Sequence, residues 1–92
     1  MTTKTFPFNI SDHLKSEDDI RGFLQEVVET GDASDFIHAL GTAARAKGMT
    51  QVAKKAGVTR ASLYKSLAED GHPQFETVNK VIDALGYKIA IV

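Results

Sequence analysis

Apolar residues recur at helical spacing along this chain, and glycines interrupt the pattern. In residues 17–30 the apolar side chains fall at i, i+3, i+4, i+7 and i+8, which is the spacing of one face of an α-helix. Stretches with a helical pattern occupy residues 17–30, 32–47, 51–56, 60–67 and 75–85. Four of the five are followed at once by a glycine, a residue that often ends helices. The sequence therefore predicts an all-α fold with five helices.

Short polar side chains stand where several of these helices begin. Ser16 lies three residues before Asp19, an arrangement that resembles a capping box. The other predicted helix caps are Asp32 or Ser34, Thr50 and Thr59. The apolar side chains expected to face the core are Ile20, Phe23, Leu24, Val27, Val28, Phe36, Ile37, Leu40, Ala43, Ala44, Val52, Ala56, Val58, Leu63, Leu67, Phe75, Val78, Val81, Ile82 and Leu85. At 92 residues, the chain is expected to form a single domain over 1–92.

The two ends of the chain lack a helical pattern. Pro7 excludes a helix interior, and apolar residues alternate from Phe6 to Ile10, so residues 1–14 are expected to form an extended N-terminal arm. Residues 87–92 are rich in β-branched side chains and predict a short C-terminal strand. Because an isolated strand is unstable, it needs the arm or the same strand of a second subunit. We therefore expect a homodimer; the alternative is a tail packed on its own helices.

Charge is divided unevenly along the chain, although the formal net charge is only −1. Residues 1–44 carry three basic and eight acidic side chains, whereas residues 45–65 carry six basic side chains and no acid. Three of the acids, Glu17, Asp18 and Asp19, stand at the start of a predicted helix, where the helix dipole favours negative charge. The purely basic segment predicts a surface that meets a polyanion.

The composition argues against several classes of function. The chain has no cysteine, which excludes thiolate zinc sites and cysteine nucleophiles and fits a cytoplasmic location. His13, His38 and His72 lack metal-site spacing, so neither a metal nor a cofactor is expected. No P-loop, dinucleotide fingerprint or nucleophile with a base is present, so we do not expect an enzyme. The longest apolar run, residues 89–92, is too short to span a membrane, and residues 1–8 lack the apolar core of a signal peptide.

Residues 49–67 have the spacing of a helix-turn-helix motif, in which two short helices cross around a turn glycine. The small Ala53 and the turn residue Gly57 permit a close crossing. With Leu63 and Leu67 facing inward, the second helix presents its opposite face to solvent. The N-terminal end of that helix is the part that enters the major groove of DNA in such motifs.

The exposed face of this second helix offers side chains suited to sequence-specific DNA binding. Arg60 can form a bidentate pair with guanine, and Tyr64 and Lys65 can contact a base edge or a phosphate. Free backbone N–H groups at helix starts attract phosphate, so the residues at the two helix starts, Thr50, Gln51 and Thr59, also become candidates for DNA contact. The predicted DNA-binding residues are Thr50, Gln51, Thr59, Arg60, Ala61, Ser62, Tyr64 and Lys65. Alternatively, the basic residues only solvate an exposed face, and the helix pair is a protein-interaction module that binds no DNA.

A further set of residues, spread over nearly the whole chain, carries a family resemblance. They are Asp18-Asp19-Ile20, Phe23-Leu24, Gly31-Asp32, Ala39-Leu40-Gly41, Ala44 to Gln51, Arg60, Ser62 to Lys65 and Ala84-Leu85-Gly86. In these residues the chain resembles the lambda-repressor-like, Cro-type helix-turn-helix family, and within it the addiction-module antidote proteins, the antitoxins of type II toxin-antitoxin pairs. Members often have Glu at the position of Ala61 and Asn at that of His72.

The resemblance implies an antitoxin that binds a RelE/ParE-like toxin and, as a dimer, represses its own operon by binding operator DNA. It makes the acidic first two helices the candidate toxin surface, because toxins of such systems are commonly basic. The nearest rival is a Cro-like transcriptional repressor without a toxin. The two differ in whether a small basic toxin-like reading frame lies beside the gene.

Overall fold

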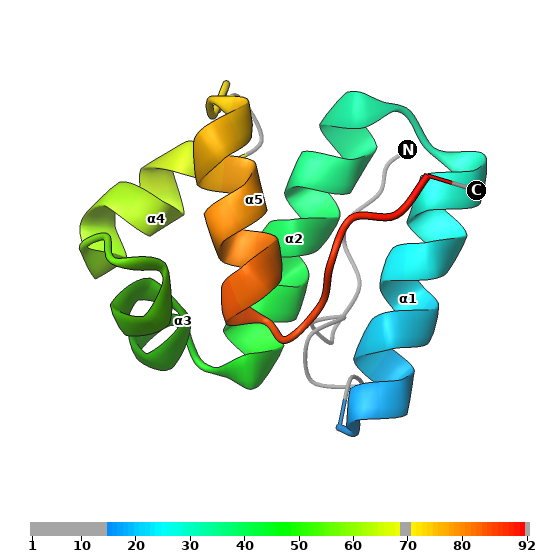
Figure 1. Ribbon diagram of the computed structural model, residues 1–92, viewed down its shortest axis with the longest axis horizontal. Coiled ribbons are helices and arrows are strands. Elements are labelled where there is room, and N and C mark those ends of the chain that lie inside the picture. The colour runs from blue at the N-terminus through cyan, green and yellow to red at the C-terminus, as the bar shows by residue number, and fades with distance from the viewer. Residues whose placement is uncertain (1–14, 69–70, 92) are drawn as a thin grey trace, which may run out of the picture.

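A computed structural model of the chain describes residues 15–68 and 71–91. These residues form five helices: α1 (Glu17–Thr30), α2 (Ala33–Lys47), α3 (Met49–Ala56), α4 (Arg60–Ser66) and α5 (Phe75–Ala84) (Figure 1). No strand is present among them. The predicted all-helical architecture is therefore confirmed, whereas the predicted N-terminal arm, residues 1–14, lies outside the described residues.

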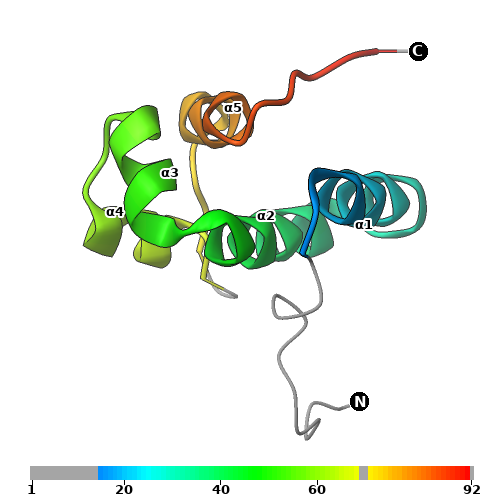
Figure 2. The ribbon, with the colours of Figure 1, turned by 90° about the horizontal axis from the view of Figure 1, so that it is seen from below.

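α2 lies at the centre of the molecule (Figure 1). α1 packs along one side of α2, and α3 and α5 contact it from the other side. α3 also packs against α5 and, across a short turn, against α4. Seen from below, α1 and α2 lie in one layer with α5 above it (Figure 2). The most deeply buried large side chains come from α2, α4, α5 and the residue after α5; they are Leu40, Leu63, Val81 and Leu85.

Short polar side chains cap three of the helices, as predicted. Ser16 and Thr59 each accept a hydrogen bond from the backbone N–H three residues on, at 3.1 and 3.0 Å. Asp32 and Asp35 form a complete capping box at the start of α2, with N–H to carboxylate distances of 2.9 and 3.0 Å. Losing such a cap typically costs about 1 kcal/mol, so these residues fix where α1, α2 and α4 begin.

Thr50 does not cap α3, contrary to the prediction. The chain passes from α2 to α3 through a single residue, Gly48, whose φ of +111° is a conformation that glycine tolerates best. The Gly48 N–H donates to the Ala44 carbonyl at 2.8 Å, and the Gly48 carbonyl accepts from the Val52 N–H at 3.0 Å. Gly48 therefore ends α2 and begins α3. The predicted cap is wrong because a one-residue junction leaves Thr50 inside the first turn of the helix.

Two apolar residues expected in the core lie on the surface. Val28 in α1 and Phe75, the first residue of α5, are 62% and 70% exposed. α1 packs mainly on α2, so it buries only a narrow stripe around Ile20 and Leu24. Phe75 precedes the buried part of α5, which begins at Val78. Helical spacing identified the correct face of each helix but overestimated how much of that face is covered.

Residues 87–91 continue beyond α5 as a tail without strand pairing (Figure 1). The predicted C-terminal strand is therefore absent from the described residues. The physical reason is that a strand requires a neighbouring strand, and the described part of one chain provides none.

A polar cluster ties the start of this tail to α1 and α2. The Tyr87 hydroxyl donates to the Glu17 carboxylate at 3.0 Å, and the Lys47 ammonium pairs with the same carboxylate. Lys47 also donates to the Leu85 carbonyl at 2.8 Å. Hydrogen bonds from Lys47 and Tyr87 lower the pKa of Glu17. Burial and the bond to Glu17 raise the pKa of Tyr87 to about 12. The cluster fixes the point at which the tail leaves the helices.

Candidate nucleic-acid interface

α3 and α4 are joined by a turn of three residues, Gly57 to Thr59. Gly57 has a left-handed conformation (φ +76°, ψ +28°) that costs other residues roughly 1–2 kcal/mol. The Val58 N–H donates to the Ala53 carbonyl at 3.0 Å, which is the hydrogen bond of a Schellman motif. Thr59 then caps α4. These local interactions set the direction in which α4 leaves α3.

The inner faces of α3 and α4 are anchored in the core. Val52 and Ala53 of α3, Leu63 of α4 and Leu67 just after α4 are all buried. The end of α4 also lies close to α2, because a Cβ added to Gly41 would lie 3.1 Å from the Leu67 carbonyl oxygen. With one face held in the core, the opposite face of α4 is held toward solvent.

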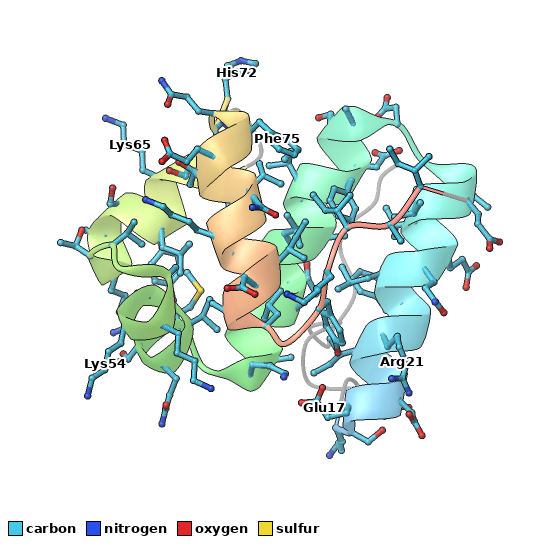
Figure 3. All side chains as sticks on the ribbon, in the orientation of Figure 1. Glu17, Arg21, Lys54, Lys65, His72 and Phe75 are labelled. Carbon is cyan, nitrogen blue, oxygen red and sulfur yellow. The ribbon has the colours of Figure 1, made fainter. Side chains whose placement is uncertain are left out.

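The outward faces of this unit expose every residue predicted to bind DNA. They are Thr50 and Gln51 in α3, Thr59 in the turn, and Arg60, Ala61, Ser62, Tyr64 and Lys65 in α4. The structure therefore brings the predicted set onto two adjacent helices and their turn. Lys54 and Lys65 project from the part of the molecule farthest from α1 (Figure 3).

No acid interrupts this surface. Residues 49–66 carry Lys54, Lys55, Arg60 and Lys65 but no Asp or Glu. Each of these basic residues is exposed, and within the described residues none of them forms an ion pair. Lys54 and Lys55 are missing from the predicted set, although the acid-free run of sequence already contained their signal. The uncompensated charge gives this surface the sign that a phosphate backbone requires.

Arg60 and Tyr64 form a pair one turn apart on the exposed face of α4. The Arg60 guanidinium lies 5.4 Å from the centre of the Tyr64 ring and donates to the Tyr64 hydroxyl at 3.4 Å. An exposed contact of this kind contributes about 0.5–1 kcal/mol, which is enough to bias the orientation of the guanidinium. A guanidinium has five N–H donors, so most of them stay available for a second, bidentate partner.

The starts of α3 and α4 differ in whether a side chain accepts a hydrogen bond from the first backbone N–H groups. At α4, the Thr59 side chain already accepts one of them, so its oxygen is engaged in capping. At α3, Gly48 provides no side-chain cap, and Thr50 and Gln51 lie in the first turn. The first N–H groups of α3 therefore remain available to water or to a phosphate oxygen.

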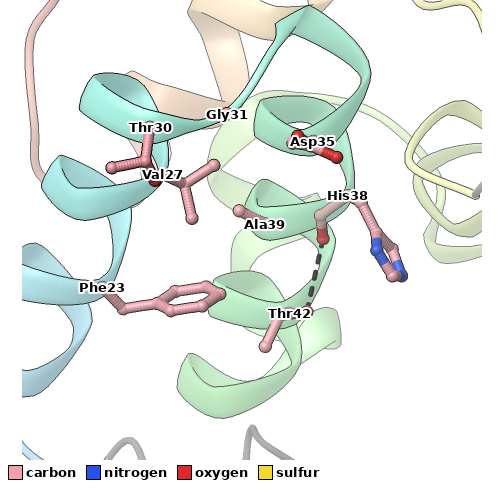
Figure 4. A pocket seen from close by; sticks show the side chains of 8 residues that line it. All are labelled: Phe23, Val27, Thr30, Gly31, Asp35, His38, Ala39 and Thr42. Carbon is pink, nitrogen blue, oxygen red and sulfur yellow. Dashed lines mark hydrogen bonds between the residues drawn. The ribbon is translucent and has the colours of Figure 1, made fainter. Parts of the chain in front are cut away.

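A separate hollow of about 300 Å³ lies between α1 and α2 (Figure 4). Its lining residues are Phe23, Val27, Thr30, Gly31, Asp35, His38, Ala39 and Thr42. On the α2 side of the hollow, the Thr42 hydroxyl donates to the His38 carbonyl one turn earlier, at 3.3 Å. The acid in the lining, Asp35, already takes part in the cap of α2. Among the residues that the structure describes, no group of three His, Cys, Asp or Glu side chains could hold a metal ion.

Comparison with known proteins finds relatives that span nearly the whole chain. Residues 4–92 match the model of a family described as "probable addiction module antidote protein". The chain is also 38% identical over 91 residues to an uncharacterized protein of Haemophilus influenzae, an alignment that covers 99% of this chain and 94% of that protein. No solved structure matches the chain. None of the described helices is both long and apolar enough to cross a membrane.

Proposed function

The chain belongs to the family of probable addiction module antidote proteins, and from that premise we propose that it is a DNA-binding antitoxin. It neutralises a cognate toxin of the RelE/ParE type in the cytoplasm and represses its own operon. Both activities are binding events, so the role requires no catalytic residue, cofactor or metal.

The observation that carries the DNA half of this proposal is the acid-free outward face of α3, the turn and α4. The unit acts as a helix-turn-helix motif of lambda-repressor-like type, and α4 enters the major groove. Arg60 pairs with guanine, and Tyr64 and Lys65 contact a neighbouring base edge or phosphate. Lys54 and Lys55, on the exposed side of α3, bind phosphates and position the unit without selecting a sequence.

A homodimer places two copies of α4 on successive turns of one face of the DNA. Such an arrangement requires half-sites about 34–36 Å apart, related by the two-fold axis of the protein. Doubling the interface also raises the number of phosphate contacts, which strengthens binding at low salt. The operator is therefore expected to be a near-palindrome in the DNA upstream of the gene.

The toxin binds the other half of the molecule, α1 and the first turns of α2. Seven acidic residues are exposed there: Glu17, Asp18, Asp19, Glu26, Glu29, Asp32 and Asp35. Some of these acids also stabilise the helices, because Asp32 and Asp35 form the capping box of α2. The charge of this surface is complementary to a basic toxin, which favours fast association.

A reporter gene placed behind the upstream DNA separates the two activities. The chain is expected to lower reporter output and to protect cells from the product of the adjacent reading frame. The double variant Arg60→Ala/Lys65→Ala should lose repression and keep protection, whereas Lys80→Ala, an exposed basic residue on α5, should keep both. Repression that survives in the double variant would refute the assigned DNA surface.

The same experiment separates the rival functions. Repression without protection from any adjacent product would identify a Cro-like repressor that has no toxin. Protection without repression, in the wild-type chain, would identify a protein-interaction module that binds no DNA.

A further inference from the structure

The tail after α5 offers an unpaired backbone and exposed apolar side chains. Its first residue is anchored, since the Tyr87 N–H donates to the Ile82 carbonyl at 3.0 Å. Residues 88–91 make no backbone hydrogen bond to any other described residue. Ile89 and Ile91 are 47% and 98% exposed, and Figure 2 shows the far end of the tail standing clear of the helices. A free edge of this kind is a template for pairing with another strand.

The side chains of the tail alternate as those of a strand do. In an extended chain, Tyr87, Ile89 and Ile91 point to one side, and Lys88 and Ala90 point to the other. The helices cover less of each successive apolar residue: Tyr87 is held by Glu17, Ile89 is 47% exposed beside Asn79 and Asp83 of α5, and Ile91 is 98% exposed. The apolar side of the tail therefore begins at Tyr87, against the helices, and continues to Ile91 beyond them.

We propose that residues 87–91 pair with the same residues of a second copy of this chain, in an antiparallel ladder across a two-fold axis. This assignment rests on the homodimer of the proposed function and names its interface. In the register that places Ile89 opposite Ile89, Tyr87 faces Ile91 of the other copy, and aromatic and β-branched residues form favourable cross-strand pairs. Lys88 then faces Ala90, so no like charges lie opposite each other. The register centred on Lys88 would instead oppose two ammonium groups.

A second copy suits this edge better than the other candidate strand of the sequence. Residues 6–10 alternate in the same way, but they contain Pro7, which has no N–H to donate to a ladder. The formal net charge of −1 also means that two copies repel each other little. The occupant favoured on these grounds is residues 87–91 of another chain.

A single cysteine tests the register directly, because the natural chain has none. Residues opposite each other in an antiparallel pair have Cα atoms about 4.5–5.5 Å apart, a separation that a disulfide spans. Ile89→Cys is therefore expected to form a covalent dimer on mild oxidation, seen on a non-reducing gel. Lys54→Cys, on the exposed side of α3, is the control and should stay largely monomeric on the same gel. An Ile89→Cys chain that stays as monomeric as the control would overturn the proposed pairing.

Sedimentation equilibrium of the full chain, without DNA or toxin, gives a second test. Ile89→Lys/Ile91→Lys should raise the dimer dissociation constant by at least about tenfold, because it places charges in the apolar contact. Phe75→Lys is the matched control, since Phe75 is equally apolar and 70% exposed but lies outside the tail. A monomeric wild-type chain, or a dimer that survives in the double variant, would overturn the interface. Operator repression by the wild-type chain tests the proposed function independently of either result.

Discussion

In the proposed function, individual side chains of α3 and α4 have distinct tasks that follow from their contacts. Arg60 is oriented by the Tyr64 ring and keeps most of its donors free, so we assign it to base recognition. Lys54 is a point charge on α3 without an ion-pair partner among the described residues, so we assign it to phosphate contact. Variants of the two residues should therefore differ in how much affinity they lose for operator DNA and for scrambled DNA.

Arg60→Ala should weaken binding to the operator by about 5- to 100-fold, equivalent to ~1–3 kcal/mol, and should weaken binding to scrambled DNA much less. Lys54→Ala should weaken both to a similar extent and reduce the slope of log K against log salt by about 1. Fluorescence anisotropy with both duplexes measures the two effects. An Arg60→Ala loss of equal size on scrambled DNA would show that this residue does not read a base.

The polar cluster at the tail predicts how stability depends on pH. Because the pKa of Tyr87 is raised from 10 to about 12 in the folded chain, its contribution is complete below pH 10 and is lost as pH rises to about 12. The stability difference between wild type and Tyr87→Phe should therefore shrink from pH 8 to pH 11. Urea unfolding at the two values measures the difference. A gap that is constant with pH would mean that Tyr87 has an ordinary pKa.

The contribution of Glu17, the acid of the same cluster, depends on pH in the opposite direction. The pKa of Glu17 is lowered from 4.5, so its contribution is present above that pH and is lost as pH falls through the lowered value. Glu17→Gln should unfold more easily than wild type at pH 7 and equally easily once the carboxylate of the wild type is protonated. Urea midpoints at pH 7 and over an acid series that extends well below pH 4.5 provide the comparison. A Glu17→Gln defect that persists unchanged in acid would contradict the assigned ion pair with Lys47.

At the level of the helices, local signals were more predictable than contacts between distant parts. Ser16, Asp32 and Thr59 cap helices within three residues of themselves, so sequence alone located these helix starts. The predicted Thr50 cap is wrong because the one-residue junction at Gly48 depends on how α3 packs against α2. The predicted burial of Val28 is wrong because spacing does not show how many neighbours cover α1.

In the candidate DNA surface too, features set by local sequence are the predictable ones. All eight predicted residues are exposed, because the turn glycine and the buried leucine of α4 together determine which face points outward. The predicted set omits Lys54 and Lys55 because no motif position marks them, although both lie in the acid-free run of sequence. The structure adds that both are exposed and form no ion pair with another described residue.

Substituting three glycines by alanine tests how the turn and the helix contacts contribute to the free energy of unfolding. Gly57→Ala should cost roughly 1–2 kcal/mol, entirely from the left-handed backbone, since no atom lies within 4 Å of the added Cβ. Gly41→Ala should be less favourable than Gly22→Ala, because its Cβ would lie 3.1 Å from the Leu67 carbonyl oxygen and this tight contact opposes the gain in helix propensity. Gly22→Ala is the control, and it should stabilise α1 by about 0.5–1 kcal/mol. Urea unfolding ranks the three, and a stabilising Gly57→Ala would contradict the turn geometry.

The whole molecule separates its charges between two ends. Exposed acids lie on α1 and at the start of α2, whereas the acid-free basic surface lies on α3 and α4. The opposite charges nearly cancel in the net charge of −1, so the net charge alone does not indicate the basic surface. In the proposed function, this separation lets the molecule approach DNA with α4 foremost and leaves its acidic end free for the toxin.

Sequence-specific DNA binding by α4 is tested most directly by fluorescence anisotropy of the purified chain on its own upstream DNA, with scrambled DNA as competitor and across a salt series. The expected result is binding at ~0.15 M salt that is at least about 1,000-fold tighter than to scrambled DNA, with a slope that reports several phosphate contacts. Equal affinity for the two DNAs at every salt concentration would contradict it.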